Sequence, residues 1–259
     1  MTGSPARTIA YGPHPDQVGE LYESARAGST LLCLLHGGFW RMPYDRHELE
    51  PIARDLHGRG YSVWNVEYRR VGIPGGGWPT PGADVMAAID HVRELDREGP
   101  TRRWSSIALI GHSAGGHLAL WAAAESARLG LVSSDLPLVA VVGLAPITDL
   151  LAAFEARLGA GAVAGLLGGS PAECPQEYRT ASPRARLPID VPILLIHGTA
   201  DDAVPIGQSR AFVDAARIAG DQAELLEVAG ADHMAHIDPA SESHAALCDW
   251  LLRSAIRTR

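Results

Sequence analysis

One pentapeptide, Gly111-His112-Ser113-Ala114-Gly115, constrains the fold more than any other stretch of the chain. An apolar run at residues 107–110, typical of a buried strand, stops at Gly111. An alanine-rich stretch with helical character begins directly after Ser113. A G-x-S-x-G sequence between a strand and a helix predicts a tight turn that holds the serine hydroxyl out from the backbone. We expect both glycines to be required, because a Cβ at either position would collide with the neighbouring chain.

The rest of the chain alternates predicted strands with predicted helices. The strands are expected at residues 17–23, 30–35, 61–68, 107–110, 139–144, 191–196 and 224–228, and the helices at 44–57, 83–95, after Ser113, at 208–219 and at 241–256. Such alternation predicts an α/β fold, a mostly parallel sheet with helices on both faces. A length of 259 residues fits one domain, residues 1–259, in which the Pro- and Gly-interrupted residues 1–16 are expected to be irregular.

Residues 147–190 break this alternation. They contain two predicted short helices, at 149–158 and 162–167, followed by a stretch that five prolines punctuate. This is too long for an ordinary connection in an α/β fold, and long excursions usually serve a function. We expect residues 147–190 to form a short cap insertion over the turn that carries Ser113.

Composition excludes several classes of partner. The net charge is −8 and all 22 basic residues are arginine, so no phosphate-neutralising patch favours nucleic acid. No apolar run has the length of a signal peptide or a membrane span, and three widely spaced cysteines are typical of a reducing cytoplasm. Neither a C-x-x-C nor an H-E-x-x-H pattern occurs, so no zinc site is expected. Neither a membrane nor nucleic acid is expected as a partner, and a homodimer is compatible with the sequence.

A serine hydroxyl is a poor nucleophile without a base and a group that orients the base. In this architecture both partners follow the serine, each on a turn beyond a later strand, in the order carboxylate then histidine. The strand at 191–196 is followed by His197-Gly-Thr-Ala-Asp201-Asp202, and the strand at 224–228 by Ala-Gly-Ala-Asp-His233. The carboxyl ends of parallel strands lie at one edge of a sheet, so Ser113, Asp201 and His233 are the predicted triad.

Two alternatives remain at this triad. Asp202 is adjacent to Asp201, which we prefer because it directly follows the H-G-x-x turn; Asp202 is then solvated or caps the turn. His236 is the alternative base, but His233 lies closer to the strand end. His236 then lines the pocket or lies on the surface.

The developing oxyanion requires preorganised N–H donors. The N–H of Ala114, at a helix N-terminus, is one candidate, and Gly38 and Phe39 in His36-Gly-Gly-Phe-Trp40 supply the others. His36, Trp40 and Trp78 are candidates for substrate contact, although tryptophans are core residues by default. Three further histidines, His112, His117 and His197, are expected to brace their own turns or pack on a helix.

These motifs resemble the α/β-hydrolase superfamily. His36-Gly-Gly-Phe-Trp40 and the G-H-S-A-G-G-H sequence at 111–117 are similar to those of kynurenine formamidases (arylformamidases) and related bacterial carboxylesterases, as are Asn65-Val-Glu-Tyr-Arg69 and the Val204-Pro205 turn. The resemblance implies acyl-serine chemistry without a cofactor, carried by Ser113, Asp201 and His233. A small carboxylic ester or an aryl formamide is the expected substrate.

Two other functions share parts of this pattern. Serine exopeptidases of prolyl-peptidase type have a similar elbow and carboxylate turn, but this sequence has no propeller domain and no obvious acidic pair to clamp a peptide amine. A catalytically silent ligand-binding protein on a hydrolase scaffold is the second alternative. The complete set of motifs argues against it.

Overall fold

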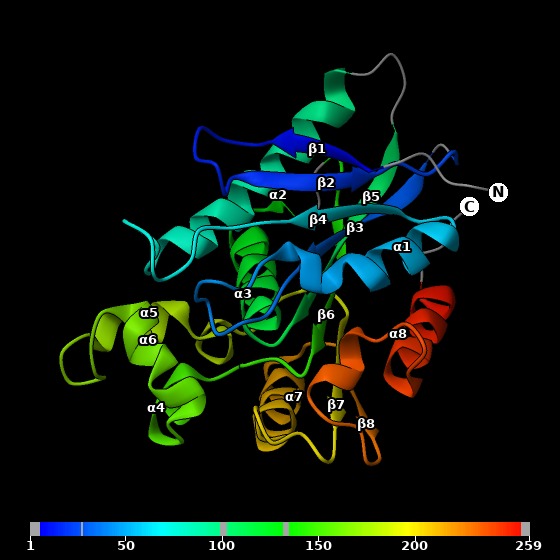
Figure 1. Ribbon diagram of the computed structural model, residues 1–259. Helices are drawn as coiled ribbons and strands as arrows, with labels where there is room; N and C mark the ends of the chain where they lie inside the picture. Colours follow the sequence, from blue (N-terminus) through cyan, green and yellow to red (C-terminus); the bar gives the residue numbers. More distant parts are fainter. Residues whose placement is uncertain (1–5, 27, 99–102, 132–134, 255–259) are drawn as a thin grey trace.

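The computed structural model describes residues 6–26, 28–98, 103–131 and 135–254. Their centre is an eight-stranded sheet with the strand order β1-β2-β4-β3-β5-β6-β7-β8 (Figure 1). The strands are β1 (Arg7–Ala10), β2 (Val18–Tyr22), β3 (Ser29–Leu35), β4 (Ser62–Val66), β5 (Trp104–His112), β6 (Leu138–Leu144), β7 (Ile193–Gly198) and β8 (Ala223–Val228). The pairs β1–β2 and β2–β4 are antiparallel and the other pairs are parallel, which confirms the predicted fold class.

The prediction that residues 1–16 are irregular is wrong at β1. This strand pairs with β2, with Ile9 opposite Gly19. It has four residues and is mostly exposed, so it carries no apolar alternation that the sequence could reveal. Its partner strand, and not its own pattern, makes it a strand.

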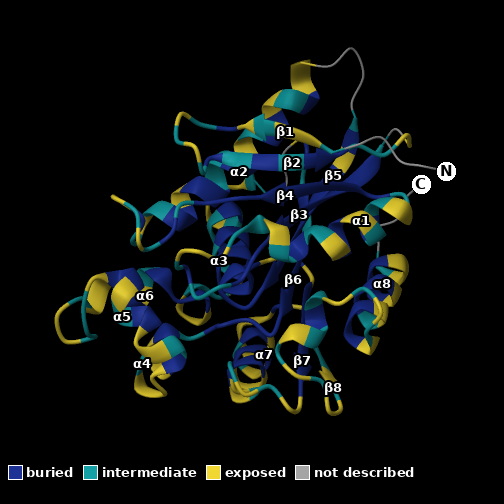
Figure 2. Cartoon of the chain, viewed as in Figure 1, coloured by how far each residue is buried: buried dark blue, intermediate teal, exposed yellow. Residues whose placement is uncertain are grey.

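Helices cover both faces of the sheet, because the central strands are apolar on both sides. The flanking helices are α1 (Glu50–Gly58), α2 (Thr80–Glu98), α3 (Ala114–Arg128), α7 (Gly207–Ala219) and α8 (Glu242–Arg253). In β3, Leu31, Cys33 and Leu35 pack into the core with α2, α3 and α7, whereas Leu32 and Leu34 pack into the core with α1 and α8. Figure 2 shows the buried strands between these layers.

Two predicted helices differ from the structure at their ends. The helix expected at 44–57 begins with a 3-10 turn, Arg46–Leu49, before α1, and Asp45 caps that turn by accepting from the His47 N–H. The helix expected at 241–256 is α8, which ends at Arg253. Residues 255 and 256 lie outside the described part of the chain.

The segment between β6 and β7 forms α4 (Leu150–Glu155), α5 (Ala162–Leu167) and α6 (Pro175–Ala181), which gather at one side of the molecule (Figure 1). The two short helices predicted here correspond to α4 and α5, whereas α6 was not predicted. A groove of about 530 Å³ runs between α4 and α6, lined by Leu151, Tyr178 and Arg184 among others. That this segment caps the site stays a prediction.

Among the described helices, none combines the length and the apolar character that crossing a membrane requires.

Candidate active site

Ser113 occupies the sharp turn between β5 and α3. Its backbone has φ 55° and ψ −116°, a left-handed conformation that a non-glycine residue rarely adopts. A Cβ built on Gly111 would lie 2.1 Å from the carbonyl oxygen of Gly115, and one on Gly115 would lie 2.0 Å from that of Leu35. Both glycines are therefore required, as the sequence predicts, because strand β5, helix α3 and the end of β3 meet without room for a side chain.

The turn after β7 brings Asp201 to His233. Asp201 Oδ2 lies 2.7 Å from His233 Nδ1, and its Oδ1 accepts the N–H groups of Ala203 and Val204 at 2.9 and 2.8 Å. Burial alone would raise the pKa of the Asp201 carboxyl, but hydrogen bonds from His197, His233 and Val204 outweigh it and hold the pKa well below its usual value. Asp201 is therefore a fully charged partner for the imidazole.

The alternative carboxylate lies elsewhere. Asp202 is exposed, whereas the Asp201 side chain is completely buried. His197 supports the buried carboxylate from its other side, with Nε2 2.8 Å from the Val204 carbonyl and 3.3 Å from Asp201 Oδ2. Its Nδ1 is 2.8 Å from Ser209 Oγ, so this ring holds the carboxylate turn in place.

His112 connects the elbow to the turn that carries His233. Its Nε2 lies 3.0 Å from the His233 carbonyl oxygen, and the two rings are 4.6 Å apart. Burial, with a smaller contribution from the nearby His233, lowers the pKa of His112 to about 3. The ring is therefore neutral, and its Nε2–H donates to the carbonyl. This bond places His233 beside the residue that precedes Ser113.

His236, the alternative base, bonds to the end of β7. Its ring is fully buried, and its Nε2 accepts the Gly198 N–H at 3.2 Å. Burial, followed by the neighbouring His197, lowers the pKa of His236 to about 4. The hydrogen bond to Asp201 is made by His233, so the structure favours His233 over His236.

The His36–Trp40 loop follows β3 and lies against the elbow. A Cβ on Gly37 would be 3.3 Å from the Ser113 Cβ. Gly38 has φ 89°, and a Cβ there would lie 2.2 Å from the Cβ of Tyr44. Phe39 also has a positive φ, 51°. The loop is thus a left-handed run of backbone beside the serine, and Ala114 begins α3 on the other side. The roles of Gly38, Phe39 and Ala114 as oxyanion donors stay predictions.

The aromatic candidates for substrate contact lie deeper than the sequence suggests. Trp40 is fully buried, and its indole N–H donates to His117 Nδ1 at 3.2 Å. His117 Nε2 in turn donates to the Ala181 carbonyl of α6 at 2.9 Å, and burial lowers the pKa of His117 to about 4. Trp78 is half-buried and packs edge-on against Trp121 at 5.0 Å. These contacts favour a structural role for Trp40 and leave Trp78 as the more accessible ring.

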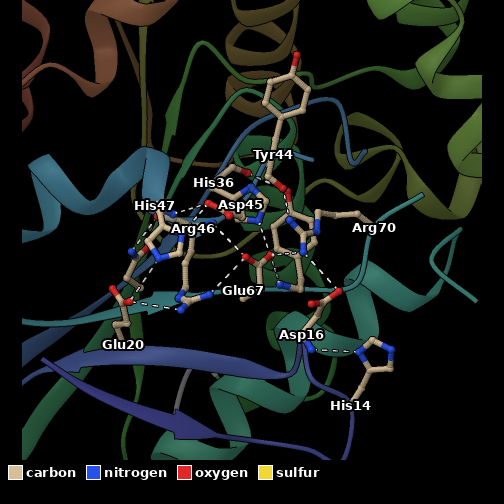
Figure 3. Close-up of polar contacts among 12 residues, drawn as sticks. His14, Asp16, Glu20, His36, Tyr44, Asp45, Arg46, His47, Glu67 and Arg70 are labelled. Atoms are coloured by element: carbon tan, nitrogen blue, oxygen red, sulfur yellow. Dashed lines mark hydrogen bonds and ion pairs between the residues drawn. The ribbon is translucent and has the colours of Figure 1, made fainter. Parts of the chain in front are cut away.

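His36 is also fully buried, with both ring nitrogens bonded inside the protein. One of its partners is Glu67, directly after β4 and within the stretch Asn65–Arg69, for which the sequence suggested no role. Arg46 and Arg70 flank the same carboxylate (Figure 3). The only sequence signal for this cluster was a charged residue at the end of a buried strand.

One group of potential metal ligands occurs among the described residues, outside the site. The ligand atoms of Asp55, His244 and Cys248 lie within 4.8 Å of one another, between α1 and α8. The same Asp55 oxygen already accepts from His244 Nε2 at 2.7 Å and from Arg59 Nε at 2.6 Å. A cation would have to displace the guanidinium, so we interpret this cluster as a link between two helices.

Two known esterases have sequences similar to this chain. Esterase LipC of Mycobacterium tuberculosis is 28% identical over 248 residues, which are 88% of this chain and 59% of that protein. Isoprenylcysteine alpha-carbonyl methylesterase ICME of Arabidopsis thaliana is 26% identical over 246 residues, 88% of this chain and 56% of that protein. The chain thus spans less than two thirds of the length of these relatives.

Solved structures show the same fold. A truncated form of a carbohydrate esterase from gut microbiota superposes with a TM-score of 0.82 at 24% identity, covering 97% of this chain and 96% of that one. A thermophilic esterase from Thermogutta terrifontis gives 0.73 at 23% identity, covering 97% and 93%. A model of the family described as BD-FAE matches residues 21–215, well over half of the chain. The chain therefore belongs to the BD-FAE family, within the α/β-hydrolase superfamily.

Proposed function

We propose that the protein hydrolyses a small carboxylic ester through an acyl intermediate on Ser113. The observation that carries the proposal is the 2.7 Å hydrogen bond between Asp201 and His233, next to a serine in a left-handed elbow. The names of the relatives, esterases from a bacterium and a plant, support an ester as the substrate.

The proposed reaction follows from the geometry. Asp201 accepts a hydrogen bond from His233 Nδ1, so His233 Nε2 is the nitrogen that takes the proton of the Ser113 hydroxyl. Ser113 Oγ then attacks the ester carbonyl. The N–H groups of Gly38, Phe39 and Ala114 stabilise the oxyanion. The protonated His233 gives its proton to the leaving alcohol, and a water molecule then releases the acyl group by the same steps. The buried charge of Asp201 stabilises the imidazolium in both halves of the reaction.

An aryl formamide is the alternative substrate, suggested by the resemblance to kynurenine formamidases. A small acyl site walled by Phe39 and Trp40 would suit a formyl group. Because Trp40 is fully buried and bonded to His117, only Phe39 is available for such a wall. This favours the ester, and a direct comparison of the two substrates decides between them.

The experiment combines labelling with a substrate panel. A fluorophosphonate probe should label the native chain and the Ser105→Ala variant, whose serine is exposed on the same strand, but not Ser113→Ala. Absence of labelling in the native chain would favour the catalytically silent scaffold. We expect turnover of p-nitrophenyl acetate; preferential turnover of N-formylkynurenine would favour the formamidase, and of aminoacyl arylamides the exopeptidase.

A further inference from the structure

A buried carboxylate lies behind the loop that carries the proposed oxyanion donors. Glu67 is 2% exposed, and its Oε1 is 2.8 Å from His36 Nε2 and accepts the Tyr68 N–H at 3.0 Å. Its Oε2 accepts the main-chain N–H of Arg46 at 3.1 Å. Figure 3 shows this carboxylate at the centre of the cluster, with His36 on one side and the side chains of Arg46 and Arg70 on the others.

The surrounding charges keep Glu67 ionised. Burial alone would raise the pKa of the Glu67 carboxyl, but the hydrogen bond and charge of His36 and the charge of Arg70, 3.3 Å away, outweigh it and lower the pKa. A buried carboxylate in this state needs donors around it. An ionised carboxylate only accepts hydrogen bonds, so His36 Nε2 carries a hydrogen.

The other nitrogen of the same ring also faces an acceptor. His36 Nδ1 lies 3.0 Å from the carbonyl oxygen of Gly37. A hydrogen on both nitrogens makes the ring an imidazolium, with Glu67 as its counter-ion. The ring stacks on Tyr68 at 4.3 Å with an interplanar angle of 9°, a favourable arrangement for a cation over an aromatic face.

These bonds fix the direction of the loop N–H groups. In a trans peptide, the C=O of one residue and the N–H of the next lie in one plane and point in opposite directions. His36 holds the Gly37 carbonyl, so the Gly38 N–H points away from the ring. The Tyr68 hydroxyl holds the His36 carbonyl at 2.9 Å, and the Arg41 N–H holds the Gly38 carbonyl at 3.0 Å. The carbonyl groups of His36, Gly37 and Gly38 therefore all have hydrogen-bond partners next to the elbow.

A second arm of the cluster reaches Gly38 through its neighbour. Arg70, paired with Glu67 and, at 3.4 Å, with Asp16, donates from Nη1 to the Tyr44 carbonyl. The side chain of Tyr44 packs directly on Gly38. The same carboxylate thus braces this glycine from the ring side and from the Tyr44 side.

We propose that Glu67 is the positioning residue of the oxyanion loop: it holds His36 in the doubly protonated form that anchors the Gly37 carbonyl and so aims the Gly38 N–H. The proposal rests on the proposed function, because the loop needs this precision only if its N–H groups bind an oxyanion.

The test compares two isosteric neutralisations. Glu67→Gln removes the counter-ion, and the neutral His36 that results can donate from only one nitrogen. Asp84→Asn is the matched control, because Asp84 is 1% exposed and binds an arginine, Arg69, at 2.7 Å, but its hydrogen bonds go to that arginine and to Gln17. Both variants should lose thermal stability, since each breaks a buried ion pair.

Only Glu67→Gln should lose catalysis. We expect kcat for p-nitrophenyl acetate to fall by about 10- to 100-fold with little change in KM, the size expected for misplaced oxyanion donors. The inhibition constant of a trifluoromethyl ketone, whose adduct carries the oxyanion, should rise by a similar factor. A kcat in Glu67→Gln equal to that of Asp84→Asn would overturn the proposal.

Two further measurements cover a failure to fold and a failure of the proposed function. If Glu67→Gln does not fold, Tyr68→Phe provides the second test. It keeps the stacked ring but removes the hydroxyl that holds the His36 carbonyl at 2.9 Å and lies 3.4 Å from the Gly37 carbonyl. The kcat should then fall by roughly tenfold; an unchanged kcat contradicts the proposal. ¹⁵N NMR of the native chain should show two N–H signals from the His36 ring, whatever the activity. A single signal would overturn the proposal, whereas two signals in a chain that hydrolyses no ester would reject the proposed function alone.

Discussion

Acidification should destabilise this protein well before its carboxylates titrate, because three buried histidines are kept neutral. Burial is the main cause that lowers the pKa of His112 to about 3 and the pKa values of His117 and His236 to about 4. In the unfolded chain each ring returns to its ordinary value of 6.5. Between these limits the unfolded state binds more protons, so the free energy of unfolding decreases as the pH falls. The contribution of the three neutral rings to the free energy of unfolding is complete above pH 6.5. It is lost progressively as the pH falls to the folded-state pKa values.

The size of the effect follows from these shifts. Between about pH 7.5 and pH 5.5, each unfolded ring gains nearly a full proton while the folded ring stays neutral, which costs about 1.4 kcal/mol per histidine. These three histidines together remove about 4 kcal/mol. The His36 imidazolium inferred above offsets about 1.4 kcal/mol of this loss, because the folded ring already holds the proton that the unfolded ring gains. The net loss of roughly 3 kcal/mol is a large part of the roughly 5–15 kcal/mol by which a domain is usually stable. Asp201, whose folded-state pKa is depressed, acts in the same direction only below its ordinary value of 3.8, outside this window.

Urea unfolding followed by tryptophan fluorescence, at constant ionic strength across this pH range, measures the effect. His236→Gln should reduce the pH-dependent loss by about 1.4 kcal/mol, since the glutamine oxygen can accept the Gly198 N–H without titrating. A free energy of unfolding that changes by less than about 1 kcal/mol across the window would refute the reasoning.

Three more outcomes follow from the structure. Asp201→Asn should lower kcat by about 10³- to 10⁴-fold, because the amide no longer fixes the tautomer of the base, whereas Asp202→Asn should be mild; the reverse order in ester kinetics would contradict the observed pairing. Gly115→Ala should cost about 3 kcal/mol or more in urea unfolding, since its Cβ would lie 2.0 Å from a main-chain oxygen of β3 that cannot rotate away. A maleimide should label the half-buried Cys174 in the native protein and spare Cys33, where burial raises the pKa to about 12; equal labelling rates would count against this assignment.

Local patterns predicted much of the fold. The fully buried strand β3 reads as a continuous apolar run, and the alternation of such runs with amphipathic helices is enough to predict a parallel sheet with two covered faces. The pattern failed where an element depends on its neighbour. Strand β1 is short and exposed and exists through its pairing with β2, and α6 begins at Pro175 within a stretch that its prolines made appear irregular.

The buried cluster around Glu67 shows a different limit. His36 and Glu67 are 31 positions apart and meet only because β3 and β4 are adjacent parallel strands. Periodicity describes which face of an element is buried, but it does not describe which polar side chains from two elements face each other. A charged residue at the end of a buried strand was visible in the sequence, and its partners were not.

By itself, the sequence determined the order of the motifs and the edge at which they meet. In a parallel sheet each loop after a strand emerges at the same edge, so the positions of Ser113, Asp201 and His233 beyond their strands are enough to predict their proximity. Only the tertiary structure decided between neighbours: Asp201 faces the imidazole while Asp202 faces solvent, and His36 turns inward to Glu67. The direction of a side chain in a turn is set by the backbone dihedrals and by the atoms packed around it, and neither is encoded in residue order alone.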